Sequence, residues 1–147
     1  MVIDESGPMR PLPLPTDDSA PYWEAMNRHE LLLQRCLDCD RVVYLPAPMC
    51  DECQSFNLEH FVSSGRGHVY SWTVVHNMGH PAFVPPYAVL LVEVEEGPRI
   101  LAQLAAPNGD EWERLEVGMP VRIAWDESEP EQTFAIFEID TDATEAA

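Results

Sequence analysis

The chain has 147 residues, of which 46% are hydrophobic and 23% charged, the balance of a globular protein with about one domain's length. Acidic residues outnumber basic ones by 26 to 8, for a formal net charge of −18, and every base is an arginine. This charge argues against a nucleic-acid binder and against docking on an anionic membrane, since both depend on Lys and Arg. No apolar run could span a bilayer and no signal-peptide pattern opens the chain, so we expect a cytoplasmic protein.

The first 34 residues are predicted to form a tail, a helix and a strand. Residues 1–16 hold four prolines that favour an extended path, so we expect a flexible tail; an arm that packs against a partner is the alternative. Within 17–34, Ser19 and the two acids before it offer helix N-caps and Pro21 suits a first helical position, so a helix should run to about residue 29. The apolar run that starts at Leu31 predicts a short strand leading into the first cysteine.

All four cysteines lie in the segment 35–58, in two C-x2-C pairs: Cys36 with Cys39, and Cys50 with Cys53. Ten residues separate the pairs, a spacing typical of a closed tetrahedral thiolate site. The alternatives are two disulfides, which a reducing compartment disfavours, or a redox-active C-x-x-C, which does not explain why the motif occurs twice. We predict one structural metal ion per chain, with zinc favoured over iron, although four thiolates alone do not separate the two metals.

After the cysteine pairs the pattern becomes all β, and residues 59–140 are assigned to one barrel. Turns rich in Gly, Pro and Asn separate the apolar or alternating runs. Strands are predicted at 42–45 between the cysteine pairs, and then at 59–62, 68–75, 87–95, 99–105, 121–126 and 133–140, with a helical turn at 110–115. This order resembles a small, partly open barrel of the OB type. Residues 141–147 are expected to form a loose acidic tail.

Residues 61–92 contain no acidic residue and a single base, Arg66. Core strands account for much of this stretch, but they account poorly for residues 77–86, a loop with three prolines that displays Phe83 and Val84. An apolar, acid-free loop on so acidic a chain predicts contact with another protein or with an apolar ligand.

The sequence shows no recognisable catalytic motif. All thiols belong to the predicted metal site, and no G-x-S-x-G, P-loop or dinucleotide-binding motif occurs. His76 and His80 have a spacing that would suit a second metal site on a helix, but Gly79 and Pro81 disfavour a helix there. The glycine-rich segment 64–67 predicts a tight turn rather than a phosphate site. We therefore predict no catalytic residues, and the chain does not resemble a self-sufficient enzyme.

Taken together, these motifs resemble the zinc-ribbon/OB-fold family associated with acyl-CoA enzymes, long known as a domain of unknown function. The resemblance covers residues 17–140. It rests, in chain order, on Tyr22-Trp23-Glu24, the entry at Leu31–Cys36, both cysteine pairs with Leu45-Pro46 between them, the segment 64–76, Pro86-Tyr87, residues 95–97 and residues 117–121. The chain departs from the family at Asp40 and Gln54, where the family often has a glycine after each second cysteine because the backbone there favours a positive φ.

The resemblance implies a mainly β fold, with an N-terminal helix, a rubredoxin-like four-cysteine zinc ribbon at 35–58 and a five- to six-stranded OB-fold barrel at 59–140. It also implies a non-catalytic accessory subunit of a thiolase-like acyl-CoA enzyme. The large partner would be an aldolase of lipid-transfer-protein type that cleaves a β-hydroxyacyl-CoA by retro-aldol chemistry in steroid side-chain degradation. Relatives in thiolase/synthase and C-acyltransferase complexes make an acyl-CoA binding or channelling protein the alternative.

On this interpretation the residues that contact the partner, or a CoA thioester as a candidate ligand, come from the acid-free stretch. They are Arg66, Tyr70, Trp72, His76, Phe83, Pro86 and Tyr87. One arginine offers little to the phosphates of CoA, so the partner is expected to supply most phosphate contacts. A nucleic-acid-binding OB/zinc-ribbon protein is a remote alternative, because the aromatic residues are present but the basic track that such a groove needs is missing.

Overall fold

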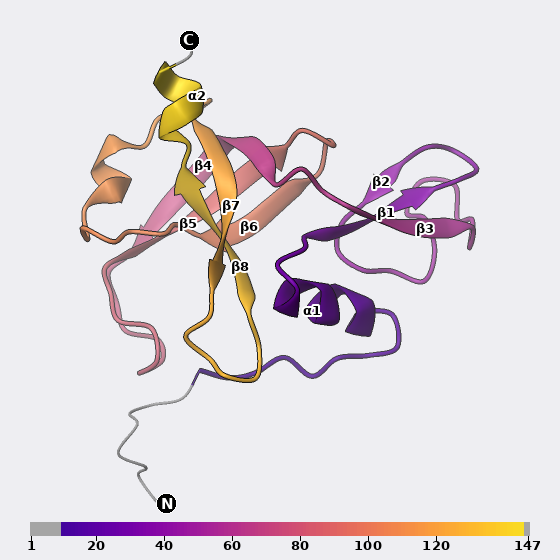
Figure 1. The fold of residues 1–147 in the computed structure, drawn as a ribbon, viewed down its shortest axis with the longest axis horizontal. Helices are drawn as coiled ribbons and strands as arrows, with labels where there is room; N and C mark the ends of the chain where they lie inside the picture. Colours follow the sequence, from indigo (N-terminus) through magenta and orange to yellow (C-terminus); the bar gives the residue numbers. More distant parts are fainter. Residues whose placement is uncertain (1–9, 146–147) are drawn as a thin grey trace, which may run out of the picture.

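The structure, a computed structural model, describes residues 10–145 and consists of two antiparallel sheets, with a helix that precedes the first of them in the chain (Figure 1). The first nine residues of the predicted tail, and residues 146–147 of the predicted acidic end, lie outside the described residues. None of the helices in the described part has the length and apolar character needed to cross a membrane.

Helix α1 (Ala20–Asn27) begins where the sequence predicts, with Ser19 as N-cap and a proline in the first turn. Its side chains Tyr22, Ala25 and Met26 are buried against the rest of the molecule. The helix therefore covers apolar surface between the two sheets instead of standing alone.

The smaller sheet has the strand order β2-β1-β3 and carries both cysteine pairs. It consists of β1 (Leu32–Cys36), β2 (Val42–Val43) and β3 (Leu58–Val62). The sequence placed β3 in the barrel, and this was wrong, because β3 pairs antiparallel with β1 from Cys36↔Leu58 to Leu32↔Val62. The reason is that the two cysteine pairs lie close together, so the chain that leaves the second pair starts its return beside the end of β1.

The larger sheet has the strand order β6-β5-β4-β7-β8 and curls into the predicted OB-type barrel. Its strands are β4 (Arg66–Val75), β5 (Tyr87–Val94), β6 (Arg99–Gln103), β7 (Pro120–Asp126) and β8 (Phe134–Ile139), with a 3-10 turn η1 (Glu111–Arg114) before β7. Beyond the end of β6, Leu104 forms a parallel bridge with Phe137, and the N–H of Ala105 donates to the Phe137 carbonyl at 2.7 Å. The edge strands therefore meet at one end only, which leaves the barrel partly open.

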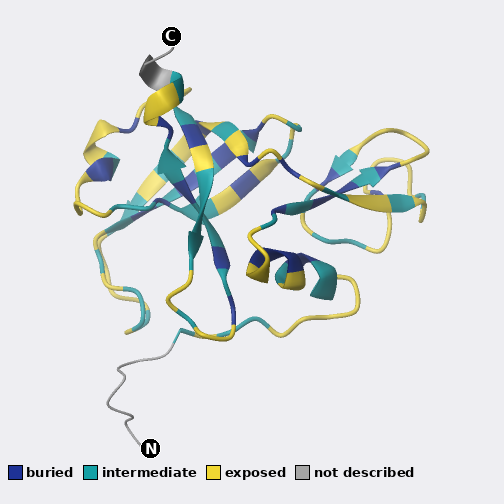
Figure 2. Ribbon diagram, viewed as in Figure 1, coloured by how far each residue is buried: buried dark blue, intermediate teal, exposed yellow. Residues whose placement is uncertain are grey.

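One apolar core fills the barrel and continues under α1 (Figure 2). Fully buried side chains of the barrel, such as Leu90 and Phe137, belong to the same cluster as Leu31, Leu33 and Met26. The far end of the ribbon has only a small separate cluster: Cys36, Val43 and Cys50. A cluster of this size cannot stabilise a fold by burial alone, so the ribbon needs a cross-link such as a metal ion.

Two local details explain how β4 enters the barrel. A Cβ at Gly65 would collide with Ile123, and a Cβ at Gly67 would collide with the carbonyl of Glu93, so both glycines allow close approach of neighbouring strands. The predicted tight turn at 64–67 was wrong, because Arg66 and Gly67 are the first residues of β4 and only Gly65 has a left-handed φ, +74°. Further along β4, the register shifts between Val69 and Ser71, which marks a β-bulge.

The C-terminal segment is more regular than predicted. Residues Thr141–Glu145 form a short helix, α2, where the sequence predicted a loose acidic tail. The carboxylate of Asp140 accepts a hydrogen bond from the N–H of Ala143 at 3.2 Å, which is the typical action of an aspartate N-cap.

Candidate functional site

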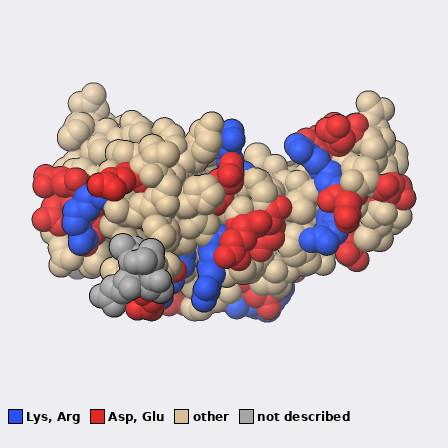
Figure 3. All heavy atoms as spheres, turned by 90° about the horizontal axis from the view of Figure 1, so that it is seen from above, with Lys and Arg blue, Asp and Glu red and all other residues tan. Residues whose placement is uncertain are grey.

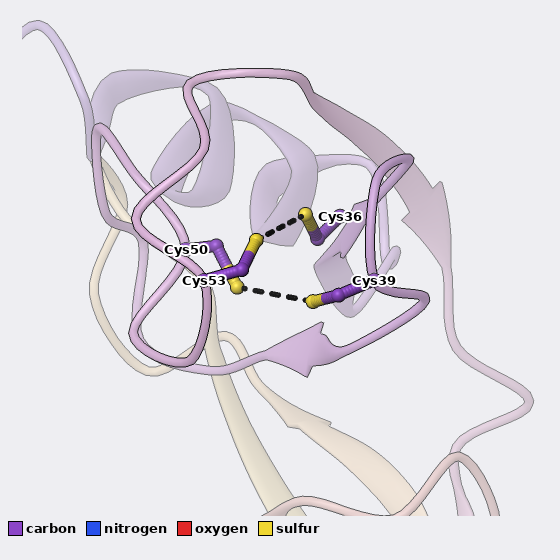
Figure 4. A group of neighbouring side chains, drawn as sticks. All are labelled: Cys36, Cys39, Cys50 and Cys53. Carbon is purple, nitrogen blue, oxygen red and sulfur yellow. Dashed lines mark hydrogen bonds between the residues drawn. The ribbon is translucent and has the colours of Figure 1, made fainter.

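The four cysteines form one compact cluster (Figure 4). All four sulfurs lie within 4.8 Å of one another, with Cys36 and Cys53 at 3.5 Å and Cys39 and Cys50 at 3.6 Å. These distances exclude disulfides, whose sulfurs are about 2.05 Å apart. A tetrahedral zinc ion with Zn–S bonds of about 2.3 Å holds its sulfurs about 3.8 Å apart. The cluster therefore fits a four-thiolate zinc site.

The two cysteine pairs have the same backbone geometry. The N–H of Asp40 donates to the Cys36 carbonyl at 2.9 Å, and the N–H of Gln54 donates to the Cys50 carbonyl at 3.1 Å. Both turns end in a left-handed residue, with φ of +69° at Asp40 and +62° at Gln54. These are the two positions where the resemblance implied glycine, so both side chains occupy a conformation that glycine adopts at lower cost.

Backbone N–H groups point at the sulfurs. Glu52 donates its N–H to the sulfur of Cys50 at 3.4 Å. Burial opposes ionisation of Cys36, yet hydrogen bonds from the N–H groups of Cys39 and Asp38 lower its pKa to about 7. Such N–H groups stabilise thiolates, the form in which cysteine binds a metal.

Polar side chains outside the cluster tie the two pairs together. The hydroxyl of Ser55 donates to the Asp38 carboxylate, and this hydrogen bond lowers the pKa of that carboxyl. Arg41, which follows the first pair, bonds both carboxylate oxygens of Asp51 in the second, at 3.1 and 2.9 Å. These contacts keep the two halves of the site in register.

The predicted contact residues do not form one surface. Trp72 pairs with the fully buried Leu90 and packs against the barrel core, so it points inward. Tyr70 lies outside the barrel with 44% of its surface exposed, and the guanidinium carbon of Arg99 lies 3.7 Å from its ring centroid. Arg66 is exposed at the far end of β4, beside residues 120–121.

The remaining predicted contacts gather around the loop 76–86, which has no regular structure, as predicted. The ring of Phe83 lies 6.0 Å from that of His80 and 6.3 Å from that of Tyr87. His76 and Pro86 are exposed beside this group. The loop thus presents an aromatic cluster at the end of the β4–β5 hairpin.

Arg10 contacts this loop, and no sequence pattern pointed to it, because the residue lies in the predicted tail. Its guanidinium carbon lies 5.2 Å from the ring centroid of Phe83 and 3.6 Å from that of Phe134. The same guanidinium bonds Asp126 at 2.9 Å, and the backbone N–H of Arg10 donates to Glu129 at 3.1 Å. Residue 10 is therefore bound to the barrel, and it joins the aromatic loop to the β7–β8 hairpin.

On the face seen in Figure 3, acidic side chains and arginines lie in neighbouring patches. Several arginines are neutralised by ion pairs; Arg122, for example, bonds Glu138 at 2.6 Å and Asp142 at 3.2 Å. Within residues 10–145, the four cysteines are the only group of three or more potential metal ligands that lie this close together, and His76 and His80 do not form a second one.

Comparison with known proteins matches both halves of the chain to family models. Residues 23–59 match the model described as "ChsH2, rubredoxin-like zinc ribbon domain", and residues 62–126 match "ChsH2, C-terminal OB-fold domain". These matches agree with the ribbon and barrel that the structure shows.

Two of the curated relatives carry hydratase names. The chain is 40% identical over 129 residues to a "Probable enoyl-CoA hydratase alpha subunit" of Thermomonospora curvata, covering 88% of this chain and 40% of the relative. It is 36% identical over 123 residues to the "3-oxo-4,17-pregnadiene-20-carboxyl-CoA hydratase alpha subunit" of Mycobacterium tuberculosis, covering 84% of this chain and 38% of the relative. The chain thus spans about two fifths of the length of each.

A solved complex contains a chain of similar length. A chain of the "Ltp2-ChsH2(DUF35) aldolase" is similar with a TM-score of 0.78 and 38% sequence identity, covering 87% of this chain and 98% of that chain. The likeness therefore extends over nearly the whole of that solved chain.

Proposed function

The chain belongs to the ChsH2 family of zinc-ribbon and OB-fold proteins, and on that premise we propose that it is a non-catalytic accessory subunit of a thiolase-like acyl-CoA enzyme. The enzyme is an aldolase of lipid-transfer-protein type that acts on a β-hydroxyacyl-CoA of steroid side-chain degradation. The likeness to nearly the full length of one chain of the Ltp2-ChsH2(DUF35) aldolase is the observation that carries this proposal.

In this proposal the chemistry of the reaction belongs to the large subunit. A retro-aldol cleavage needs a base that takes the proton of the β-hydroxyl, while the electron pair of the Cα–Cβ bond passes to the thioester enolate, which is then protonated. Within residues 10–145, all four thiols lie in the metal cluster. We assign the base and the stabilisation of the enolate to the large subunit.

The metal in this proposal is zinc, held by Cys36, Cys39, Cys50 and Cys53. Four thiolates complete a tetrahedral shell, so the ion would stabilise the ribbon instead of binding substrate. The small buried cluster of the ribbon supports this role, because it offers little apolar burial of its own.

The aromatic loop is the first candidate for a partner contact. Phe83 is half-buried, Val84 is 73% exposed and Met78 is 59% exposed. The loop carries no acidic residue, and Arg10 and its contacts hold it in place. A preformed apolar loop loses little conformational entropy on binding, which favours association.

A second candidate function is acyl-CoA binding by the chain itself. One observation favours it, a mainly apolar groove of about 480 Å³ between α1, the segment 44–46 and the free edges of β6 and β8. Grooves of this size accept small ligands. Arg10 is the one base among its lining residues, and it is already paired with Asp126, so this candidate offers CoA phosphates little attraction.

The test is co-expression with an Ltp2-type aldolase, followed by size-exclusion chromatography and a turnover assay on a β-hydroxyacyl-CoA. We expect a stable complex and an aldolase that is active only when this chain is present. An aldolase that works at full rate alone would contradict the proposal. In that case, micromolar binding of CoA thioesters to the isolated chain would support the carrier function instead.

A further inference from the structure

The outer face of the β4–β5–β6 sheet is a second surface without charge, and Tyr87 connects it to the aromatic loop. The register places residues of the three strands in rows across this face. One row is Ser71–Leu91–Leu101, the next is Thr73–Val89–Gln103, and the third is Val75–Tyr87. No row contains a charged residue.

These side chains point away from the core. Along β5 the buried residues are Ala88, Leu90, Val92 and Val94, while the alternate residues are only partly covered (Figure 2). Inward-facing neighbours such as Trp72 and Ala102 pack against the core cluster, whereas Val89, Leu91 and Leu101 do not belong to it. Leu101 is 65% exposed, so the face is open at its β6 side.

A row of charged residues that form ion pairs with one another borders this face. Across the same three strands lie His68, Glu93 and Arg99. Glu93 bonds Arg99 at 3.1 Å and lies 3.5 Å from His68, while Arg99 also covers the ring of Tyr70. An apolar centre beside a polar rim is the usual anatomy of a protein–protein interface.

The net charge of the chain indicates which kind of partner fits this face. Two copies of a chain with a net charge of −18 repel each other, so a second copy is a poor occupant of this face. A basic partner would be held by carboxylates, and the face has none between its rim and the aromatic loop. The occupant that fits is a different protein with an apolar, uncharged surface.

We infer that the outer face of β4–β5–β6, centred on Leu91 and Leu101, is the principal docking surface for the large subunit. This inference rests on the proposed function and deepens it. It also explains the acid-free stretch 61–92, because β4 and β5 supply two of the three strands. The aromatic loop then extends the docked area past the Val75–Tyr87 row.

The experiment measures the Kd between the purified Ltp2-type aldolase used in the co-expression test and variants of this chain. The variants are Leu101→Ser and the double variant Leu91→Ser/Leu101→Ser, with Val117→Ser as matched control. Val117 is also an exposed aliphatic side chain, 73% exposed, but it lies in the turn before β7. Zinc content and circular dichroism verify that each variant is folded.

We expect about a tenfold or greater loss of affinity for Leu101→Ser, a larger loss for the double variant, and wild-type affinity for Val117→Ser. Leu101→Met should bind with wild-type affinity, because methionine keeps the apolar contact. Wild-type affinity in the folded double variant would overturn the inference and leave the proposed function standing. An aldolase that does not bind the wild-type chain would overturn the proposed function itself, and the inference with it.

A second measurement tests whether a second copy of this chain occupies the face. Sedimentation velocity of the chain alone should show a monomer at micromolar concentration. A dimer that Leu101→Ser disperses would overturn the inference, because a second copy would then occupy the face.

Discussion

Replacing Asp40 and Gln54 by glycine should stabilise this protein. Both residues end a cysteine turn in the left-handed region, with φ of +69° and +62°. For a residue with a Cβ, the left-handed conformation has a free energy roughly 1–2 kcal/mol above that of its preferred conformation. Neither side chain has a hydrogen bond or ion pair in the structure that the substitution would remove. The gain is therefore offset only by the greater freedom of glycine in the unfolded chain.

That offset is about 0.5–1 kcal/mol per glycine. The net gain is then about 0.5–1 kcal/mol for Asp40→Gly and a similar amount for Gln54→Gly. For a chain of this length, 1 kcal/mol raises the Tm by about 2–4 °C. The double variant should unfold about 2–8 °C above the wild type, provided that the two turns contribute independently.

The assay is thermal unfolding of the zinc-loaded protein, followed by circular dichroism. Glu52→Gly is the matched control, because Glu52 is an exposed acid in the same turn and its φ is not positive. This control should lower the Tm, since glycine there gains only unfolded-state freedom. The reasoning is refuted if glycine at 40 and 54 lowers the Tm as much as glycine at 52.

Three further outcomes test other parts of the structure. Cys50→Ser, or a strong chelator, should remove the single zinc and unfold the ribbon; metal analysis and circular dichroism check this, and a metal-free variant with wild-type spectra would contradict it. Trp72→Ala should lower the free energy of unfolding by about 3 kcal/mol, because the side chain packs on the core; denaturant unfolding measures this. Phe83→Ala should mainly weaken association with the partner, which a pull-down measures. Glu111 is buried, which opposes ionisation, but hydrogen bonds from the N–H groups of residues 108–111 lower its pKa. The ionised Glu111 carboxylate therefore adds to the free energy of unfolding above the ordinary glutamate pKa, and this contribution is lost as the pH falls through the lowered pKa. Glu111→Gln should remove this part of the pH dependence and flatten the acid limb of a stability–pH curve.

The ribbon was the part of the fold most open to prediction. Ligand spacing within each C-x2-C pair is a local property, so the sequence predicted the cluster that the structure shows. The family resemblance, and not the spacing, indicated the left-handed turns at Asp40 and Gln54. Strand positions followed from alternating or apolar runs between turn residues, and the observed strands lie within two residues of most predicted bounds.

The direction of side chains along β4 could not be predicted. Tyr70 and Trp72 are two residues apart, so a regular strand would place them on the same face. The bulge between Val69 and Ser71 inserts one residue, and as a result Tyr70 stays outside while Trp72 turns into the core. From the sequence, both residues were predicted to contact the partner. The bulge instead places Trp72 against the core.

The amino-acid sequence by itself determined the zinc-ligand set, the strand positions and the acid-free stretch, because each depends on neighbours within a few residues. Only the tertiary structure decided which residues share a surface. It pairs β3 with β1, brings Arg10 against Phe83, and aligns Leu91 with Leu101. These arrangements depend on strand register and chain closure between distant segments, where a shift of one residue exchanges the two faces of a strand.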